Sequence, residues 1–147
     1  MTSRIHKGIG LALVTMLALV LRIHHLDYES LFMDELRQVS YYSNSFIEIV
    51  GNAATTQQPP LDYWIGHIFF YFSQSDFSAR LPAALFGTGS VWLIIKLAAR
   101  DTPWVIAVSI GLLMALSPYH IYFSQDARPY AISIFFLLAF LCALEAI

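Results

Sequence analysis

Charged residues are scarce in this sequence. Only 12% of its 147 residues are Asp, Glu, Lys or Arg, whereas 58% are hydrophobic and the mean hydropathy is +0.63. A chain of this length could hardly hide so much apolar surface in one soluble core, and its composition is typical of a polytopic membrane protein. We therefore predict an all-α fold, a polytopic transmembrane helix bundle with additional helices lying at the membrane surface.

Cysteine and runs of basic residues are also nearly absent. The one cysteine, Cys142, lies in an apolar segment, which excludes an internal disulfide and favours a packing role. With a net charge of −2 and no Lys/Arg run, the chain is not expected to bind nucleic acid. His24 and His25 lack the spacing of a metal site, so the sequence predicts no cofactor and supports no divalent metal.

The first apolar segment, residues 8–26, is long enough to cross a bilayer, which takes roughly 20 residues. Arg4 and Lys7 precede it and favour a cytoplasmic N-terminus, and Arg22 is expected to snorkel to the far interface. No small-residue cleavage site follows, so the segment is interpreted as an uncleaved first span rather than a signal peptide.

Residues 27–58 then form a predicted first outer loop. Ser30 is a plausible N-cap for a surface helix over residues 31–45. An apolar stripe with helical spacing would face the lipid headgroups or the bundle; it consists of Phe32, Leu36, Val39 and Tyr42. Residues 51–58 are interpreted as a polar connection.

The aromatic segment after Pro59 and Pro60 decides the topology. A helix over residues 60–73 is predicted, and the twelve residues 61–72 would rise only about 18 Å, too little to cross the hydrocarbon. If it crossed, Lys96 and Arg100 would lie outside the cell. If it stays at the surface, both are cytoplasmic, as the positive-inside rule prefers, and we adopt this second topology.

Three further spans follow from that choice, at residues 79–99, 103–123 and 130–147, with Pro82 and Pro103 in first turns. Since the last of them ends on an apolar residue without a polar flank, we expect residues 1–147 to be the N-terminal part of a longer transmembrane domain.

The acidic residues concentrate in and after the first outer loop. Seven of the ten lie between Asp27 and Asp76, and most of these are interpreted as solvated loop charges. Asp34 and Glu35 differ because they stand between apolar neighbours. A carboxylate at a low-dielectric boundary has a perturbed proton affinity, as a general base requires.

The second outer loop, residues 124–129, returns to the same side. It brings Gln125, Asp126 and Arg128 toward Asp34. Arg128, and Arg80 at the outer start of the second predicted span, suit a phosphate clamp because a guanidinium offers a bidentate fork. The alternative is that these arginines snorkel and pair with Asp126 or Asp76.

Several motifs in this order resemble the GT-C glycosyltransferases, specifically the bacterial branch related to protein O-mannosyltransferases and the aminoarabinose transferases of lipid A. They are Leu21-Arg22, Leu31-Phe32-Met33-Asp34-Glu35, Gln58-Pro59-Pro60-Leu61, Phe77-Ser78-Ala79-Arg80-Leu81-Pro82, Ser117-Pro118, and Tyr122-Phe123-Ser124-Gln125-Asp126-Ala127-Arg128-Pro129-Tyr130-Ala131.

The resemblance implies inverting transfer of a sugar from a polyprenyl-phosphate donor to a lipid, glycan or protein acceptor at the extracytoplasmic face of a multi-pass protein of the bacterial inner membrane. It implies Asp34 as general base, with Glu35 and Asp126 as further catalytic carboxylates. The implied substrate-binding residues are Arg80, Gln125, Arg128, Tyr130, Pro59 and Pro60. Family members commonly have Glu at the position of Asp126, and they have more spans, so this chain alone is expected to be inactive.

The competing hypothesis is a non-catalytic polytopic membrane protein, a transporter or an assembly subunit, in which Arg80, Asp126 and Arg128 form structural ion pairs. A transporter is disfavoured because its ionisable residues usually lie deep within the spans. Membrane lipids are partners under every hypothesis.

Overall fold

The computed structural model describes residues 2–56 and 60–144, and these residues are arranged in helices without any strand. The helices are α1 (Thr2–Ile23), α2 (Met33–Ser40), α3 (Phe46–Thr56), α4 (Pro60–Phe72), α5 (Asp76–Asp101), α6 (Trp104–Leu116), α7 (Pro118–Ser124) and α8 (Tyr130–Leu144). The predicted all-α membrane helix bundle is confirmed.

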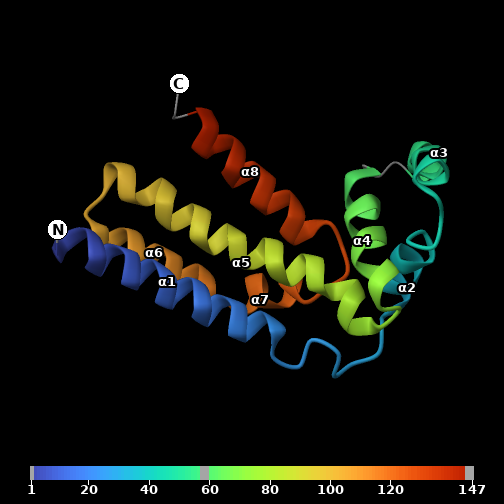
Figure 1. Ribbon diagram of the computed structural model, residues 1–147, viewed down its shortest axis with the longest axis horizontal. Coiled ribbons are helices and arrows are strands. Elements are labelled where there is room, and N and C mark those ends of the chain that lie inside the picture. Colours follow the sequence, from blue (N-terminus) through green and yellow to red (C-terminus); the bar gives the residue numbers. More distant parts are fainter. Residues whose placement is uncertain (1, 57–59, 145–147) are drawn as a thin grey trace.

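Helix α5 is the centre of the bundle, in contact with α1, α4, α6, α7 and α8 (Figure 1). Its buried face is rich in small residues, which allow close approach of neighbouring helices. A Cβ added at Gly87, for example, would lie 2.1 Å from the hydroxyl of Ser124, so α7 can pack here only against glycine. The apolar core beside it consists of Val14, Ala18, Val91, Ile95 and Ala115.

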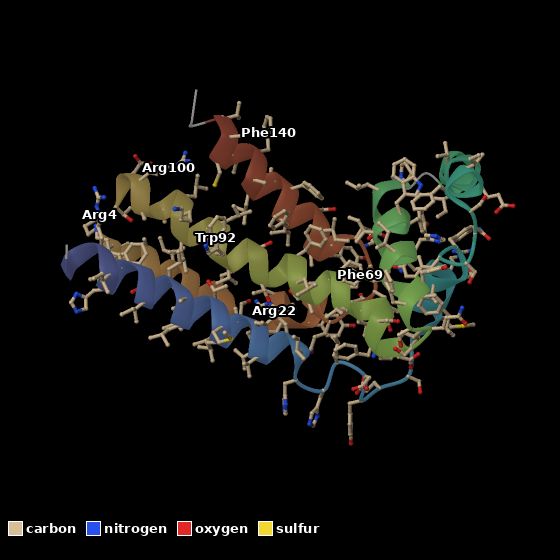
Figure 2. All side chains as sticks on the ribbon, viewed as in Figure 1. Arg4, Arg22, Phe69, Trp92, Arg100 and Phe140 are labelled. Carbon is tan, nitrogen blue, oxygen red and sulfur yellow. The ribbon has the colours of Figure 1, made fainter. Side chains whose placement is uncertain are left out.

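The long helices run alternately in opposite directions, α1 and α6 one way and α5 and α8 the other (Figure 1). Arg4 and Arg100 lie together at one end of the bundle, whereas α2, α3 and α4 gather at the other (Figure 2). Helix α4 closely matches the predicted residues 60–73 and stays at that end. The predicted loops at residues 27–58 and 124–129 thus lie at the same end of the molecule, while the side of the membrane that residues 60–73 occupy stays a prediction.

Within residues 2–56 and 60–144, two helices are long and apolar enough to cross a membrane, Arg4–Ile23 and Asp76–Asp101. The pair α6 and α7 would be a third span if the two helices count as one, and α8 is a shorter apolar helix. These helices overlap the predicted spans at residues 8–26, 79–99, 103–123 and 130–147, of which residues 145–147 lie outside the described chain. That each of them crosses the bilayer stays a prediction.

The third predicted span is not one continuous helix. It breaks at Ser117 and bends by 61° between α6 and α7. Pro118 explains the break, because proline has no N–H to donate and its ring clashes with the carbonyl one turn earlier. Ser117 then caps α7 by accepting from the N–H of His120.

The carbonyls left at the end of α6 are bound by Arg22 of α1. Its guanidinium donates to the carbonyls of Ala115 and Met114, at 3.4 and 3.5 Å, and its Nη2 lies 2.7 Å from Nδ1 of His120. The side chain is fully buried. The prediction that Arg22 snorkels to the interface is therefore wrong, because the broken helix beside it supplies polar partners inside the bundle.

The first outer loop contains two helices where one was predicted over residues 31–45. Helix α2 ends at Ser40, and α3 covers most of the stretch at residues 51–58 that was interpreted as a polar connection, so both predicted boundaries are wrong. The missed signal is a capping box, in which the carboxylate of Glu48 accepts from the N–H and hydroxyl of Ser45.

The start of α2 and the start of α5 also differ from prediction. Phe32, not Ser30, is the N-cap of α2, and Pro82 lies inside α5 because Ser75 caps that helix at Asp76. In α2 the polar Glu35 and Gln38 are buried, while Phe32 and Leu36 of the predicted stripe are exposed. The bundle therefore does not cover the first half of that stripe.

Candidate functional site

The first outer loop (residues 27–58) and the second outer loop (residues 124–129) meet at the end of the bundle that carries α2, α3 and α4. We call them the two acidic loops. The backbone N–H of Ala127, in the loop between α7 and α8, donates to the carboxylate of Glu35 in α2 at 2.8 Å. One residue away on each segment, Arg128 Nη1 lies 2.9 Å from the carboxylate of Asp34. Two adjacent contacts thus join segments more than 90 residues apart in the sequence.

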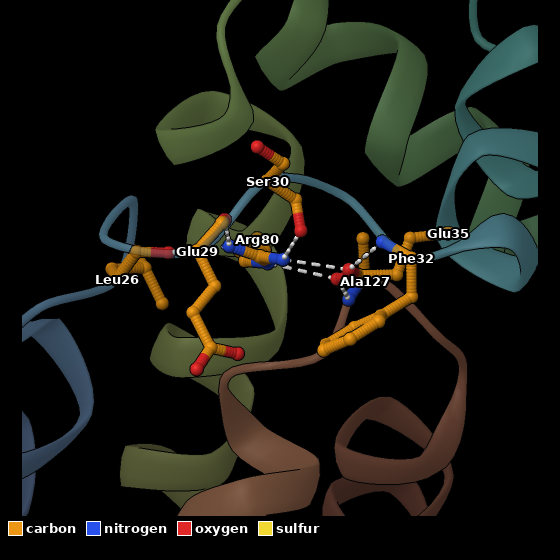
Figure 3. Close-up of polar contacts among 7 residues, drawn as sticks. All are labelled: Leu26, Glu29, Ser30, Phe32, Glu35, Arg80 and Ala127. Carbon is orange, nitrogen blue, oxygen red and sulfur yellow. Dashed lines mark hydrogen bonds and ion pairs between the residues drawn. The ribbon is translucent and has the colours of Figure 1, made fainter.

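Glu35 is the most completely bound acid of the site. Its carboxylate accepts from Arg80 Nε at 2.8 Å, from Arg80 Nη2 at 2.6 Å and from the N–H of Phe32 at 3.0 Å, besides Ala127 (Figure 3). Burial by itself would raise its pKa, but the hydrogen bonds from Arg80, Ala127 and Phe32 outweigh burial and lower the pKa. Glu35 is therefore held as an ionised carboxylate.

Arg80, near the start of α5, is bound just as fully. Its remaining N–H groups donate to three backbone carbonyls of the segment that links α1 to α2: Leu26 at 3.0 Å, Glu29 at 2.7 Å and Ser30 at 3.3 Å (Figure 3). A guanidinium has five N–H donors, and here each of them has a partner. The alternative interpretation, in which Arg80 pairs with Asp126 or Asp76, is wrong in its partner, since the acid that pairs with Arg80 is Glu35.

Asp34 and Arg128 form a much more open pair. The side chain of Asp34 is 76% exposed and that of Arg128 is 21% exposed. Arg128 also stacks on the ring of Tyr130, 5.6 Å from its centre, and Nη2 donates to the Tyr130 hydroxyl at 3.4 Å. In the described part of the chain, Nε of Arg128 is buried without a hydrogen-bond partner.

A pocket of about 350 Å³ opens between the α1–α2 linker and the α7–α8 loop. Asp126 lies on its wall, and burial, with the nearby Glu35 carboxylate, raises the pKa of Asp126 to about 6 despite Arg128 and Arg80. The rings of His25 and Tyr28 stack on each other in the lining of the same pocket. The backbone of His25 has a φ of 58°. The lining consists of His25, Leu26, Tyr28, Glu29, Phe32, Glu35, Arg80, Tyr122, Gln125 and Asp126.

Gln125 connects the α7–α8 loop to the end of α1 by hydrogen bonds. Its side-chain amide donates to the carbonyls of Arg22 at 3.2 Å and His24 at 2.9 Å, and so binds backbone groups at the end of that helix. Gln125 thus has a structural partner as well as a place in the pocket wall.

The structure therefore gathers most of the predicted site residues at one end of the molecule. Glu35, Arg80, Gln125 and Asp126 line the pocket, while Asp34, Arg128 and Tyr130 belong to the open ion pair beside it. Pro60 is the first residue of α4, and Pro59 lies outside the described residues. The chemical role of each residue stays a prediction.

One buried acid was missed. Asp62 of α4 is 6% exposed and accepts a hydrogen bond from the amide of Gln38. Burial raises the pKa of Asp62 to about 7, although that hydrogen bond and the charge of Arg128 oppose the rise. The sequence signal that could have indicated a buried acid was a single carboxylate in a helix of mostly apolar and aromatic residues. Across residues 2–56 and 60–144, no three His, Cys, Asp or Glu side chains are grouped to hold a metal ion.

Comparison with known proteins gives one match. Residues 57–147 match the family described as dolichyl-phosphate-mannose-protein mannosyltransferase. The matched region contains Arg80 and the whole of the α7–α8 loop, and it begins after Asp34 and Glu35. Searches of curated proteins and of solved structures returned no match.

Proposed function

Since this chain belongs to the dolichyl-phosphate-mannose-protein mannosyltransferase family, we propose that it carries out the sugar-transfer chemistry of a membrane glycosyltransferase. The donor is a sugar linked to a polyprenyl phosphate, and the acceptor hydroxyl reaches it at the extracytoplasmic face of the membrane. The family and the apolar helices already define a membrane protein of a glycosyltransferase kind.

The observation that carries the proposal is the contact between the two acidic loops. Asp34 pairs with Arg128 at 2.9 Å, so a carboxylate and a guanidinium from distant segments lie together beside a pocket. Transfer needs both groups. A base must take a proton from the acceptor hydroxyl, and a cation must offset the charge on the departing phosphate.

In the proposed reaction the acceptor oxygen attacks the anomeric carbon as its proton passes to Asp34. The bond between that carbon and the phosphate oxygen breaks, the phosphate leaves with the electron pair, and the configuration at carbon inverts. Arg128 exchanges its contact with Asp34 for the phosphate, which a guanidinium fork binds well. Asp126, in the pocket wall, accepts a hydrogen bond from the acceptor.

The test is Asp34→Asn in the full-length protein, which keeps the size of the side chain and removes its basicity. Transfer from a polyprenyl-phosphate sugar should fall roughly 100-fold or more, the usual contribution of a general base. Asp27 is an exposed residue of the same loop, and its substitution Asp27→Asn is the matched control. This variant should transfer sugar at the wild-type rate. Wild-type rates with Asp34→Asn would remove the base role.

A further inference from the structure

We propose that Glu35 and Arg80 are positioning residues, which hold the two acidic loops in register and contact neither donor nor acceptor. This inference rests on the proposed function, and it separates two pairs of residues that adjoin each other in space. Glu35 and Arg80 set the geometry, whereas Asp34 and Arg128 meet the substrates.

Arg80 has no donor to offer a phosphate. All five of its N–H groups are already bound, to the Glu35 carboxylate and to the carbonyls of Leu26, Glu29 and Ser30 (Figure 3). The carbonyls belong to a linker without helical hydrogen bonds of its own at Glu29 and Ser30. An anion could bind Arg80 only by unfolding this linker from it.

Glu35 is equally committed. Both carboxylate oxygens are bound, Oε1 by Arg80 and Ala127 and Oε2 by Arg80 and Phe32. These partners belong to different segments of the chain: α5, the α7–α8 loop and the start of α2. These hydrogen bonds lower the pKa of Glu35 and fix its side chain, so that it cannot turn toward a substrate. Glu35 is therefore suited to hold the three segments together and not to act as a general base.

Glu35 lies where it can fix the positions of the other two acids of the site. Asp34 directly precedes Glu35, and Asp126 directly precedes Ala127, so one carboxylate fixes the backbone next to both other acids of the site. Any shift of Glu35 must therefore move Asp34 and Asp126 relative to each other. Small errors of this kind are costly in catalysis, where about 1 Å of misplacement can lower a rate 100-fold.

Arg128 differs from Arg80 in each respect that matters for a ligand. It is partly exposed, its acidic partner is mostly exposed, and its Nε lacks a hydrogen-bond partner within residues 2–56 and 60–144. Arg128 is therefore the arginine that can turn to an incoming phosphate.

The experiment compares Arg80→Lys with Arg128→Lys in the full-length protein, with Arg37→Lys of the exposed face of α2 as control. Arg80→Lys should lower kcat about tenfold or more and leave the KM for the polyprenyl-phosphate sugar within about twofold. Arg128→Lys should raise that KM about tenfold, because lysine cannot bind phosphate bidentately. A raised donor KM with unchanged kcat in Arg80→Lys would overturn the inference.

A second measurement does not depend on activity. With Cys142→Ala as background, Leu26→Cys places a thiol at a site 1% exposed, on the linker that Arg80 holds. Thiol labelling should be slow in this parent and at least about tenfold faster once Glu35→Gln or Arg80→Lys is added, because the buried pair no longer closes the linker. Unchanged labelling in properly inserted variants would contradict the positioning role. If the labelling rates differ as expected but the wild-type protein transfers no sugar, only the proposed function is contradicted.

Discussion

Two ion pairs stand side by side at the loop end of this molecule, and they differ chiefly in burial. The side chains of Arg80 and Glu35 are 5% and 2% exposed, whereas those of Arg128 and Asp34 are 21% and 76% exposed. Adjacent residues of α2 supply the two acids. The comparison teaches that neighbours in sequence can have opposite surroundings, one acid bound on every side and the other largely open to solvent.

The largest effect should follow from breaking the buried pair. Glu35→Leu leaves the Arg80 guanidinium buried without its counter-charge, which costs about 3–5 kcal/mol in comparable sites. Thermal unfolding of the detergent-purified protein should show this loss. The single variant Arg80→Met and the double variant Glu35→Leu, Arg80→Met complete the cycle, and the double loss should be smaller than the sum of the two single losses. A double loss equal to that sum would show that the two charges are not coupled.

An intermediate effect concerns Asp126, whose carboxyl group feels the charges of Glu35, Arg80 and Arg128. Its pKa is raised from 3.8 to about 6, so in this window the folded protein binds a proton that the unfolded chain releases. The free energy of unfolding should therefore fall as pH rises from about 4 to 6. Asp126→Asn removes this contribution and should gain roughly 1–3 kcal/mol relative to wild type at pH 8. Unfolding followed at pH 4.5 and pH 8 measures the difference, and an equal gain at both values would contradict it.

The smallest effect should come from the open pair. Arg128→Gln is expected to change the free energy of unfolding by less than about 1 kcal/mol, because its partner Asp34 is 76% exposed and an ion pair open to water on one side is worth little and is screened by salt. The same unfolding measurement, at low and high salt, checks this. A loss as large as that of Glu35→Leu would show that the two pairs do not differ as their burial indicates.

The helices and the meeting of the loops could be predicted from the sequence because they depend on local quantities. The apolar segments predict the long helices and Pro60 begins α4, while the orientation inferred from Lys96 and Arg100 stays a prediction. The partner of Arg80 could not be predicted, because Glu35 is 45 residues away and Asp76 and Asp126 were equally eligible by charge. Only packing decides which acid is buried with an arginine.

Other misses have the same origin. The bend at Pro118 is visible in the sequence, but a proline in a membrane helix is tolerated when neighbours satisfy the backbone, and here that neighbour is Arg22 from another helix. Asp62 likewise depends on Gln38, which comes from a different helix. Each required knowledge of which segments lie side by side.

The buried Arg22 also has a consequence for the order of synthesis. Helix α1 is made first, yet the carbonyls of Met114 and Ala115 that bind its guanidinium lie 92 and 93 residues later in the chain. Arg22 is the next-to-last residue of α1. Until α6 has been made, the Arg22 guanidinium lacks these two carbonyl partners. The contact that joins the end of the first helix to the break after the sixth can therefore form only once most of this chain has been made.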